Sequence, residues 1–185
     1  MISNSLNNLK EKSFYKLLFG RTALPIIIIV GIALIYVVLM TMIDHSTLPF
    51  HIVVAVAALI KTIVITLTTL KKLSKLIKIC HSLERLLWVF GLIIVIIVFS
   101  FATDYTCLYQ FDHAAFEGIP DFSNTYLYNL YHFFYFSVIT FSTVGFGDIT
   151  PVSDVAKFVI MLEIFLSFFI IVFALTNIKK IHLNE

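Results

Sequence analysis

The sequence predicts an all-α membrane protein with four transmembrane helices and a shorter re-entrant helix that is followed by an extended segment. Hydrophobic residues make up 60% of the 185 residues and charged residues only 13%, about half the charged share of a soluble domain. Four apolar segments reach or approach the ~20 residues that a helix needs to cross the hydrocarbon core. A fifth apolar segment, of about 12 residues, lies between the last two and is too short to cross.

These segments define the predicted domain organisation. Residues 24–70 form a two-helix N-terminal membrane region, and residues 86–178 form a second unit with an outer helix over 86–103, a re-entrant helix over about 129–142, an extended segment over 143–148 and a last span over 155–178. Asn129 can cap the re-entrant helix, because its side chain accepts hydrogen bonds from first-turn N–H groups. Irregular backbone at membrane depth must be surrounded by protein or a water-filled cavity. We therefore expect other helices and other subunits to cover it.

The basic residues orient the chain. Eleven of the 13 Lys and Arg precede the first span, lie between spans two and three, or follow the last span. By the positive-inside rule these regions are cytoplasmic, which predicts a multi-pass protein of the plasma membrane with both termini inside. The cytoplasmic parts are 1–23, which is either an interfacial helix or a flexible tail, 71–85 and the tail 179–185. The opposite loop, 104–125, has four acids and no Lys or Arg, so it should concentrate cations.

Residues 143–148 read Thr-Val-Gly-Phe-Gly-Asp. A potassium ion crosses a pore where rings of backbone carbonyls from four subunits replace its hydration shell. An extended chain whose carbonyls all face one way needs alternating unusual dihedrals, which glycine adopts without a steric penalty. We expect the ion-binding stretch to run through Gly147, with the Thr143 hydroxyl closing its inner end and ion sites at the carbonyls of Thr143, Val144, Gly145 and Phe146.

Together with the short aromatic helix before it and the full span after it, this motif resembles the pore domain of the tetrameric potassium-channel family: outer helix, pore helix, selectivity filter and inner helix. The resemblance covers residues 86–178. It implies a homotetramer with one pore on the four-fold axis and passive conduction of potassium. It implies potassium ions in the filter, no organic cofactor, no enzymatic activity and no nucleic-acid partner.

Several positions depart from the family pattern. Phe146 replaces the commoner tyrosine, and Ile139 lies where some members carry a glutamate that pairs with the filter aspartate. We therefore expect Asp148 to be held by the Tyr135 hydroxyl or by water. Ser167 takes the place of the family's hinge glycine.

The family spacing predicts that the inner cavity is lined by Phe168, Ile171 and Leu175. Large apolar residues at a narrow point can gate a pore by dewetting. Alternatively, these three are ordinary helix-packing residues.

Lys61 and Glu163 are the ionisable residues expected inside spans, where a charge is expensive and a functional role is the default hypothesis. They either pair with each other or each meet hydroxyls of the pore helix such as Ser137 and Thr140. The simpler alternatives are that Lys61 reaches to the cytoplasmic face and that Glu163 is protonated and hydrogen-bonded.

The linker 71–85 carries Lys72, Lys75 and Lys78 at a spacing of three, which resembles a voltage-sensor helix. Such sensors have four helices before the pore, whereas two are predicted here. We favour a basic amphipathic helix at the cytoplasmic surface that attracts anionic lipid.

Three other functions are alternatives to a potassium channel: a less selective monovalent cation channel of the same fold, a transporter subunit with a degenerate filter, and a non-conducting membrane scaffold. The transporter would need four non-identical pore loops in one chain, and this sequence has one. The scaffold would leave the filter motif unexplained. Seven residues follow the last span, so the sequence shows no ligand-gating domain there; such a domain is either lacking or has been removed.

Overall fold

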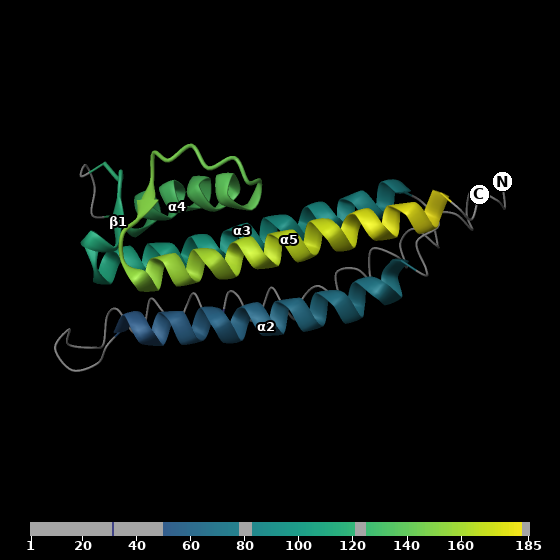
Figure 1. Cartoon of the computed structure of the whole chain (residues 1–185), viewed down its shortest axis with the longest axis horizontal. Coiled ribbons are helices and arrows are strands. Elements are labelled where there is room, and N and C mark those ends of the chain that lie inside the picture. Colours follow the sequence, from purple (N-terminus) through teal and green to yellow (C-terminus); the bar gives the residue numbers. More distant parts are fainter. Residues whose placement is uncertain (1–30, 32–49, 78–82, 121–124, 183–185) are drawn as a thin grey trace, which may run out of the picture.

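The computed structural model describes residues 31, 50–77, 83–120 and 125–182. Three long helices, α2 (Phe50–Ile77), α3 (Leu83–Phe111) and α5 (Asp154–His182), run side by side, and the short helix α4 (Tyr126–Phe141) lies beside α3 at one end (Figure 1). A 3₁₀ turn, η1 (His113–Ala115), and the strands β1 (Phe116–Glu117) and β2 (Thr150–Pro151) lie at that end too. The predicted span 24–43 and the segment 1–23 lie outside the described residues, apart from Gly31.

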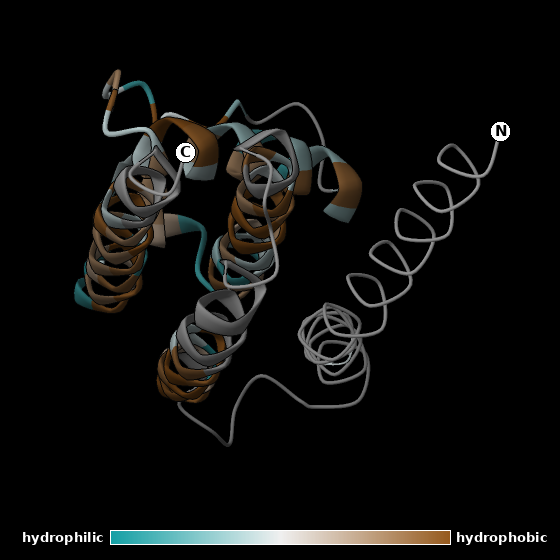
Figure 2. Cartoon of the chain, turned by 90° about the vertical axis from the view of Figure 1, so that its right-hand side faces the viewer, coloured by the Kyte–Doolittle hydropathy of each residue, from teal (hydrophilic) through white to brown (hydrophobic). Residues whose placement is uncertain are grey.

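The long helices have the length and composition of membrane spans. They contain 28 or 29 residues each, which corresponds to roughly 42 Å at ~1.5 Å per residue and exceeds the ~30 Å of the hydrocarbon core. Among the described residues, the stretches Leu87–Phe111 and Asp154–Thr176 are long and apolar enough to cross a membrane, and α2 contains a shorter apolar stretch, Ile52–Leu67. Figure 2 shows that hydrophobic residues predominate along these helices.

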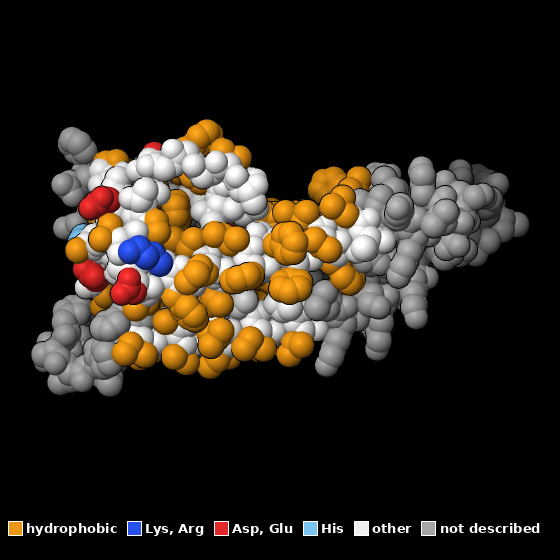
Figure 3. All heavy atoms as spheres, viewed as in Figure 1, with side chains coloured by type: hydrophobic (Ala, Val, Ile, Leu, Met, Phe, Trp, Pro, Cys, Tyr) orange, Lys and Arg blue, Asp and Glu red, His pale blue; other side chains and the backbone are white. Residues whose placement is uncertain are grey.

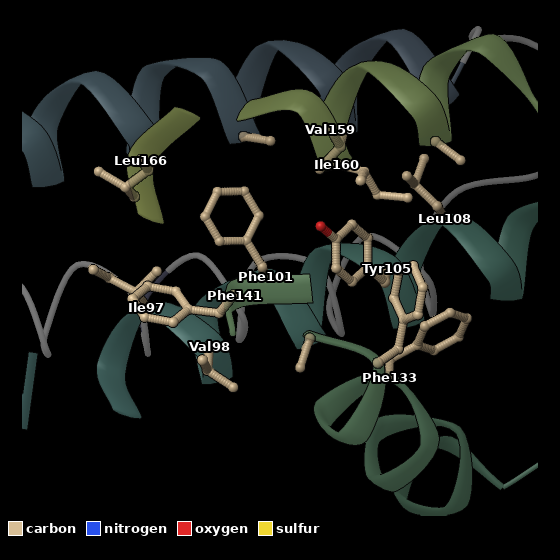
Figure 4. Close-up of a cluster of buried hydrophobic side chains, with 14 of the residues drawn as sticks. Ile97, Val98, Phe101, Tyr105, Leu108, Phe133, Phe141, Val159, Ile160 and Leu166 are labelled. Atoms are coloured by element: carbon tan, nitrogen blue, oxygen red, sulfur yellow. The ribbon is translucent and has the colours of Figure 1, made fainter. Parts of the chain in front are cut away.

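Apolar side chains lie both inside and outside this bundle. The buried core joins α3, α4 and α5 and contains Phe101, Tyr105 and Phe133, with Val159 and Ile160 of α5 on the opposite side (Figure 4). The face in Figure 3 is mostly apolar along its described length, and its charged side chains gather at the end that carries α4. An apolar exterior is unfavourable in water and suits a lipid or protein environment.

Several predicted boundaries were wrong. The outer helix does not end at residue 103 but continues to Phe111, because Asp104 is buried within the bundle and so does not mark the helix end. The pore helix begins at Tyr126, and its N-cap is Thr125. Asn129 is therefore not the cap; it is a buried residue of the first turn.

The linker 71–85 is not a separate helix over its first half. Helix α2 continues through it to Ile77, because no glycine or proline interrupts residues 50–90. Residues 78–82 lie outside the described part. Helix α5 likewise continues past the predicted end at residue 178, to His182.

Candidate functional site

The segment with the filter motif, residues 143–148, follows α4, which packs an aromatic face against α3. Phe133 and Phe136 are buried, and their rings meet Tyr105 of α3 with centroids 6.1 and 5.4 Å away. Phe116 of β1 meets Phe133 with a centroid separation of 4.8 Å. Aromatic pairs of this kind contribute about 0.5–1.5 kcal/mol each beyond their buried area, so these contacts fix α4 against α3.

The end of α4 leads directly into the filter segment through a hydrogen-bonded cap. The Thr143 N–H donates to the Thr140 carbonyl at 3.0 Å, and the Val144 N–H donates to the Ile139 carbonyl at 2.9 Å. Thr143 has a φ of 61°. This pair of bonds with a left-handed residue is a Schellman motif, in which glycine is the usual residue. A β-branched residue rarely adopts positive φ, so Thr143 is held in a strained conformation.

Positive φ recurs at every second residue of the filter segment. The values are 61° at Thr143, 54° at Gly145 and 78° at Gly147, whereas the φ angles of Val144 and Phe146 are not positive. Gly145 and Gly147 thus adopt the unusual dihedrals that were expected of glycines at these positions. Alternation of this kind is the backbone pattern expected of a chain that directs successive carbonyls to one side.

The side chains between these positions have no cover within the chain. Val144 is 53% exposed and Phe146 is 70% exposed. Both are apolar and belong to a segment that the sequence analysis places at membrane depth. The segment therefore presents an uncovered apolar surface on this chain.

The outer end of the filter is joined to the loop that follows α3. Strand β1 pairs with β2 in antiparallel register, with Glu117 opposite Thr150. Next to this pair, Gly118 has a φ of 89° and approaches the Asp148 backbone so closely that a Cβ atom there would lie 1.8 Å from the Asp148 carbonyl oxygen. Only glycine permits this contact.

The Asp148 carboxylate has a partner on α4. A side-chain hydrogen bond to Asp148 raises the pKa of the half-buried Tyr135 phenol, so the phenol keeps its proton at neutral pH. Tyr135 and Asp148 thus lie close together, as expected if the Tyr135 hydroxyl replaces the glutamate that holds this aspartate in some family members.

The predicted gate residues on α5 lie in different environments. Ser167 is 1% exposed, and its hydroxyl donates to the Ile164 carbonyl of its own helix at 2.8 Å. Phe168 and Leu175 are 63% and 64% exposed. Ile171 lines an apolar cleft of about 300 Å³ with residues of α3 and α4. All three predicted lining residues are therefore exposed on the continuous helix α5, and Ile171, at 38%, is the least exposed of them.

Lys61 and Glu163 are both buried, but they do not pair with each other. Lys61 forms an ion pair with Asp104 of α3, and its Nζ donates to the Ser100 carbonyl at 2.9 Å. The ring of Phe101 lies 5.1 Å from this Nζ. The direct Lys61–Glu163 pair is therefore absent, and Lys61 does not reach toward the membrane surface.

Glu163 instead contacts hydroxyls on two other helices. Its Oε1 lies 2.5 Å from the Ser137 Oγ of α4, and its Oε2 lies 2.5 Å from the Tyr105 hydroxyl of α3. The Ser137 Oγ also lies 3.0 Å from the Val98 carbonyl. Ser137 was one of the hydroxyl partners considered from the sequence; Thr140 is not part of these contacts.

Asp104 and Tyr105 were not predicted as members of this polar cluster. Asp104 was expected to begin an outer loop, although apolar and aromatic residues continue at helical spacing through Phe101, Tyr105 and Leu108. That periodicity could have extended the helix by two turns. The partner of Asp104 could not have been found in this way, since Lys61 is 43 residues away.

Comparison with known proteins identifies the family. Residues 86–183, just over half of the chain, match the family described as ion channel. A stretch of 52 residues is 44% identical to Potassium channel K2 of Plasmodium falciparum (isolate 3D7); it covers 28% of this chain and only 3% of that protein. No solved structure matches the chain. With its apolar spans, the chain is a membrane protein, and the family match confirms the resemblance drawn from the filter motif: this chain belongs to the ion channel family.

Proposed function

We propose that the chain is a subunit of a potassium-selective channel, in which four copies surround one pore and conduct potassium passively. The observation that carries this proposal is the alternation of positive φ at Thr143, Gly145 and Gly147 in a segment attached directly to α4. A run of four residues with aligned carbonyls offers successive sites that replace the water around a potassium ion. The ion sites are assigned to the carbonyls of residues 143–146, with the Thr143 hydroxyl at the inner end.

The exposed side chains of the filter support assembly around a central axis. In the proposed tetramer, Val144 and Phe146 point away from the ions into a wall to which neighbouring subunits contribute. Burying one such side chain stabilises an assembly by roughly 1.5–3 kcal/mol, and four copies multiply the effect. Phe168, Ile171 and Leu175, which are exposed on α5, then face the cavity below the filter.

The charge distribution supports the proposed orientation in the plasma membrane. The described acids Asp112, Glu117, Asp148 and Asp154 are exposed at the end of the molecule that carries α4. This end is assigned to the outside, where it concentrates cations. Both termini and the basic stretch 71–85 are assigned to the cytoplasmic side, where the basic side chains attract anionic lipid.

A reversal-potential measurement in liposomes tests the proposed function. With potassium on one side and sodium on the other, we expect a reversal potential close to the potassium equilibrium potential. A reversal near zero would favour the less selective cation channel instead. A reversal near the sodium potential, or an absence of flux, would overturn the proposal.

Two glycine variants extend this measurement, one as a test of the filter backbone and the other as its matched control. Gly147→Ala places a Cβ on a residue with a φ of 78°, so we expect loss of selective conduction. Gly91→Ala changes an exposed position of α3 with no neighbouring atom within 4 Å of the new Cβ, so we expect conduction like that of the unmodified chain.

A further inference from the structure

A cluster of buried polar side chains lies under the pore helix, and none of its members belongs to the filter. It consists of Lys61, Asp104, Tyr105, Ser137 and Glu163, which come from α2, α3, α4 and α5 and are at most 1% exposed. Buried polar and charged groups are costly unless they are paired and hydrogen-bonded. The cluster therefore specifies how these four helices pack together, and its hydrogen atoms can be assigned by counting donors.

The count begins at Ser137, whose hydroxyl carries one proton and has two oxygen neighbours. They are the Val98 carbonyl oxygen at 3.0 Å and the Glu163 Oε1 at 2.5 Å. A carbonyl oxygen can only accept, so the Ser137 proton goes to Val98 if that bond is to form. The short contact to Glu163 then needs a proton from the carboxyl group. Tyr105 donates its own proton to the other carboxyl oxygen, Oε2, at 2.5 Å.

This assignment satisfies every contact at once when Glu163 is a neutral carboxylic acid. Its O–H donates to Ser137, Ser137 donates to Val98, and Tyr105 donates to Glu163. A charged Glu163 would leave either the Val98 contact or its own contact to Ser137 without a proton. The titratable groups around Glu163 are Lys61 on α2 and Asp104 and Tyr105 on α3. Lys61 is the cation among them, and because it already forms an ion pair with Asp104, it does not supply Glu163 with an unshared counter-charge.

The position of Ser137 connects this cluster to the filter. Ser137 lies two residues before Ile139, whose carbonyl accepts the Val144 N–H, and three residues before Thr140, whose carbonyl accepts the Thr143 N–H. A shift of α4 at Ser137 would move both cap carbonyls, and the filter would move with them. Glu163 is on α5, so its contact with Ser137 joins α5 to the pore helix.

We propose that Glu163, acting as a neutral hydrogen-bond donor to Ser137 and acceptor from Tyr105, is a positioning residue that holds the pore helix and thereby the filter in register with the inner helix. It does not touch the ions and acts through Ser137 and the cap of α4. The inference rests on the proposed function, since it concerns the potassium sites of the same filter.

The test measures how potassium stabilises the purified full-length chain against heat, with sodium replacing potassium at constant ionic strength. A ligand that binds only the folded state stabilises it by RT ln(1 + c/Kd) at a free ligand concentration c, so the unfolding midpoint reports the affinity of the filter sites for potassium without requiring an open gate. The unmodified chain comes first. If potassium does not raise its midpoint above that in sodium, the proposed function fails, whatever the role of Glu163.

Three variants then separate the possibilities. We expect Ser137→Ala and Glu163→Leu each to raise the potassium Kd obtained from the midpoint shifts by about tenfold, because a hydrogen bond of this strength is worth roughly that factor in an equilibrium. Glu163→Gln keeps both a donor and an acceptor at this position without charge. We expect it to stay within about twofold of the unmodified chain, the range of a fully replaced hydrogen bond.

Ser100→Ala is the matched control. Ser100 is as buried as Ser137, but its hydroxyl has no hydrogen-bond partner among the described residues, so its loss should leave the potassium dependence unchanged. If Glu163→Gln behaves like Glu163→Leu, the neutral-donor role is wrong. If Ser137→Ala behaves like Ser100→Ala while the unmodified chain responds to potassium, the positioning role is wrong. The Ser137→Ala result decides this even if Glu163→Leu does not fold.

Discussion

Replacing Gly118 by alanine should disturb the filter from outside, although Gly118 precedes the filter by 25 residues or more. The new Cβ would lie 1.8 Å from the Asp148 carbonyl oxygen, whereas ordinary contact begins at 3.4 Å. The loop after α3 and the outer end of the filter must therefore separate by at least 1.6 Å. An opening of that size breaks the short β1–β2 pair, since hydrogen bonds to oxygen weaken beyond ~3.2 Å.

The energetic cost combines two contributions. A side chain at a φ of 89° costs about 1–2 kcal/mol in an L-residue, and each lost backbone hydrogen bond costs about 0.5–1.5 kcal/mol net. The sum, about 2–4 kcal/mol, exceeds the ~1.4 kcal/mol that corresponds to a tenfold change in an equilibrium. We expect at least a tenfold loss of potassium flux in liposomes, or faster loss of conduction during sustained opening.

Gly91→Ala provides the comparison, because it makes the same chemical change within a helix where no atom obstructs the Cβ. It should stabilise the chain by about 0.5–1 kcal/mol and leave flux unchanged. Flux and potassium preference of Gly118→Ala equal to those of Gly91→Ala would show that the β1–β2 contact does not constrain the filter.

Further variants test the frame around the pore. Tyr135→Phe removes the hydrogen bond to the filter aspartate, so conduction should decay several-fold faster during sustained opening; unchanged decay kinetics would contradict this. Lys61→Met removes the ion-pair partner of the buried Asp104 and should destabilise the chain by about 3–5 kcal/mol, as measured by thermal unfolding, whereas Lys61→Met with Asp104→Leu should recover most of that loss. Phe168→Cys should react with a cytoplasmic thiol reagent and block flux, and the buried control Leu166→Cys should not; equal reactivity would remove Phe168 from the cavity.

The sequence was sufficient for features encoded in local patterns. The sequence predicted unusual backbone dihedrals at the glycines of the segment 143–148, and Gly145 and Gly147 do have positive φ. The pore helix was found because a short aromatic segment cannot cross a bilayer. The positive φ of Thr143 could not have been predicted, because it belongs to a helix cap that a β-branched residue normally avoids.

Features that depend on contacts between residues far apart in the sequence could not be predicted from local patterns. Asp104 is polar and follows an apolar run, so the local signal for a helix end was reasonable. Its burial depends on Lys61, a residue of another helix. For the same reason, the choice between a Lys61–Glu163 pair and separate partners could not be made from spacing, since Lys61 contacts residues of α3 and Glu163 contacts residues of α3 and α4.

Contacts within one chain position the filter backbone, whereas the filter side chains need neighbouring copies to cover them. Within a single chain, α4 is fixed by aromatic packing on α3, by the Glu163–Ser137 contact to α5 and by the Gly118 contact at the outer end. The filter backbone is therefore positioned before any neighbour is present. Its apolar side chains, Val144 and Phe146, nevertheless remain exposed, so the ring of carbonyls can close only in the proposed tetramer. Variants of Gly118, Ser137 or Glu163 should therefore alter the stability of the filter in every assembled copy. Variants of Val144 or Phe146 should first reduce assembly itself.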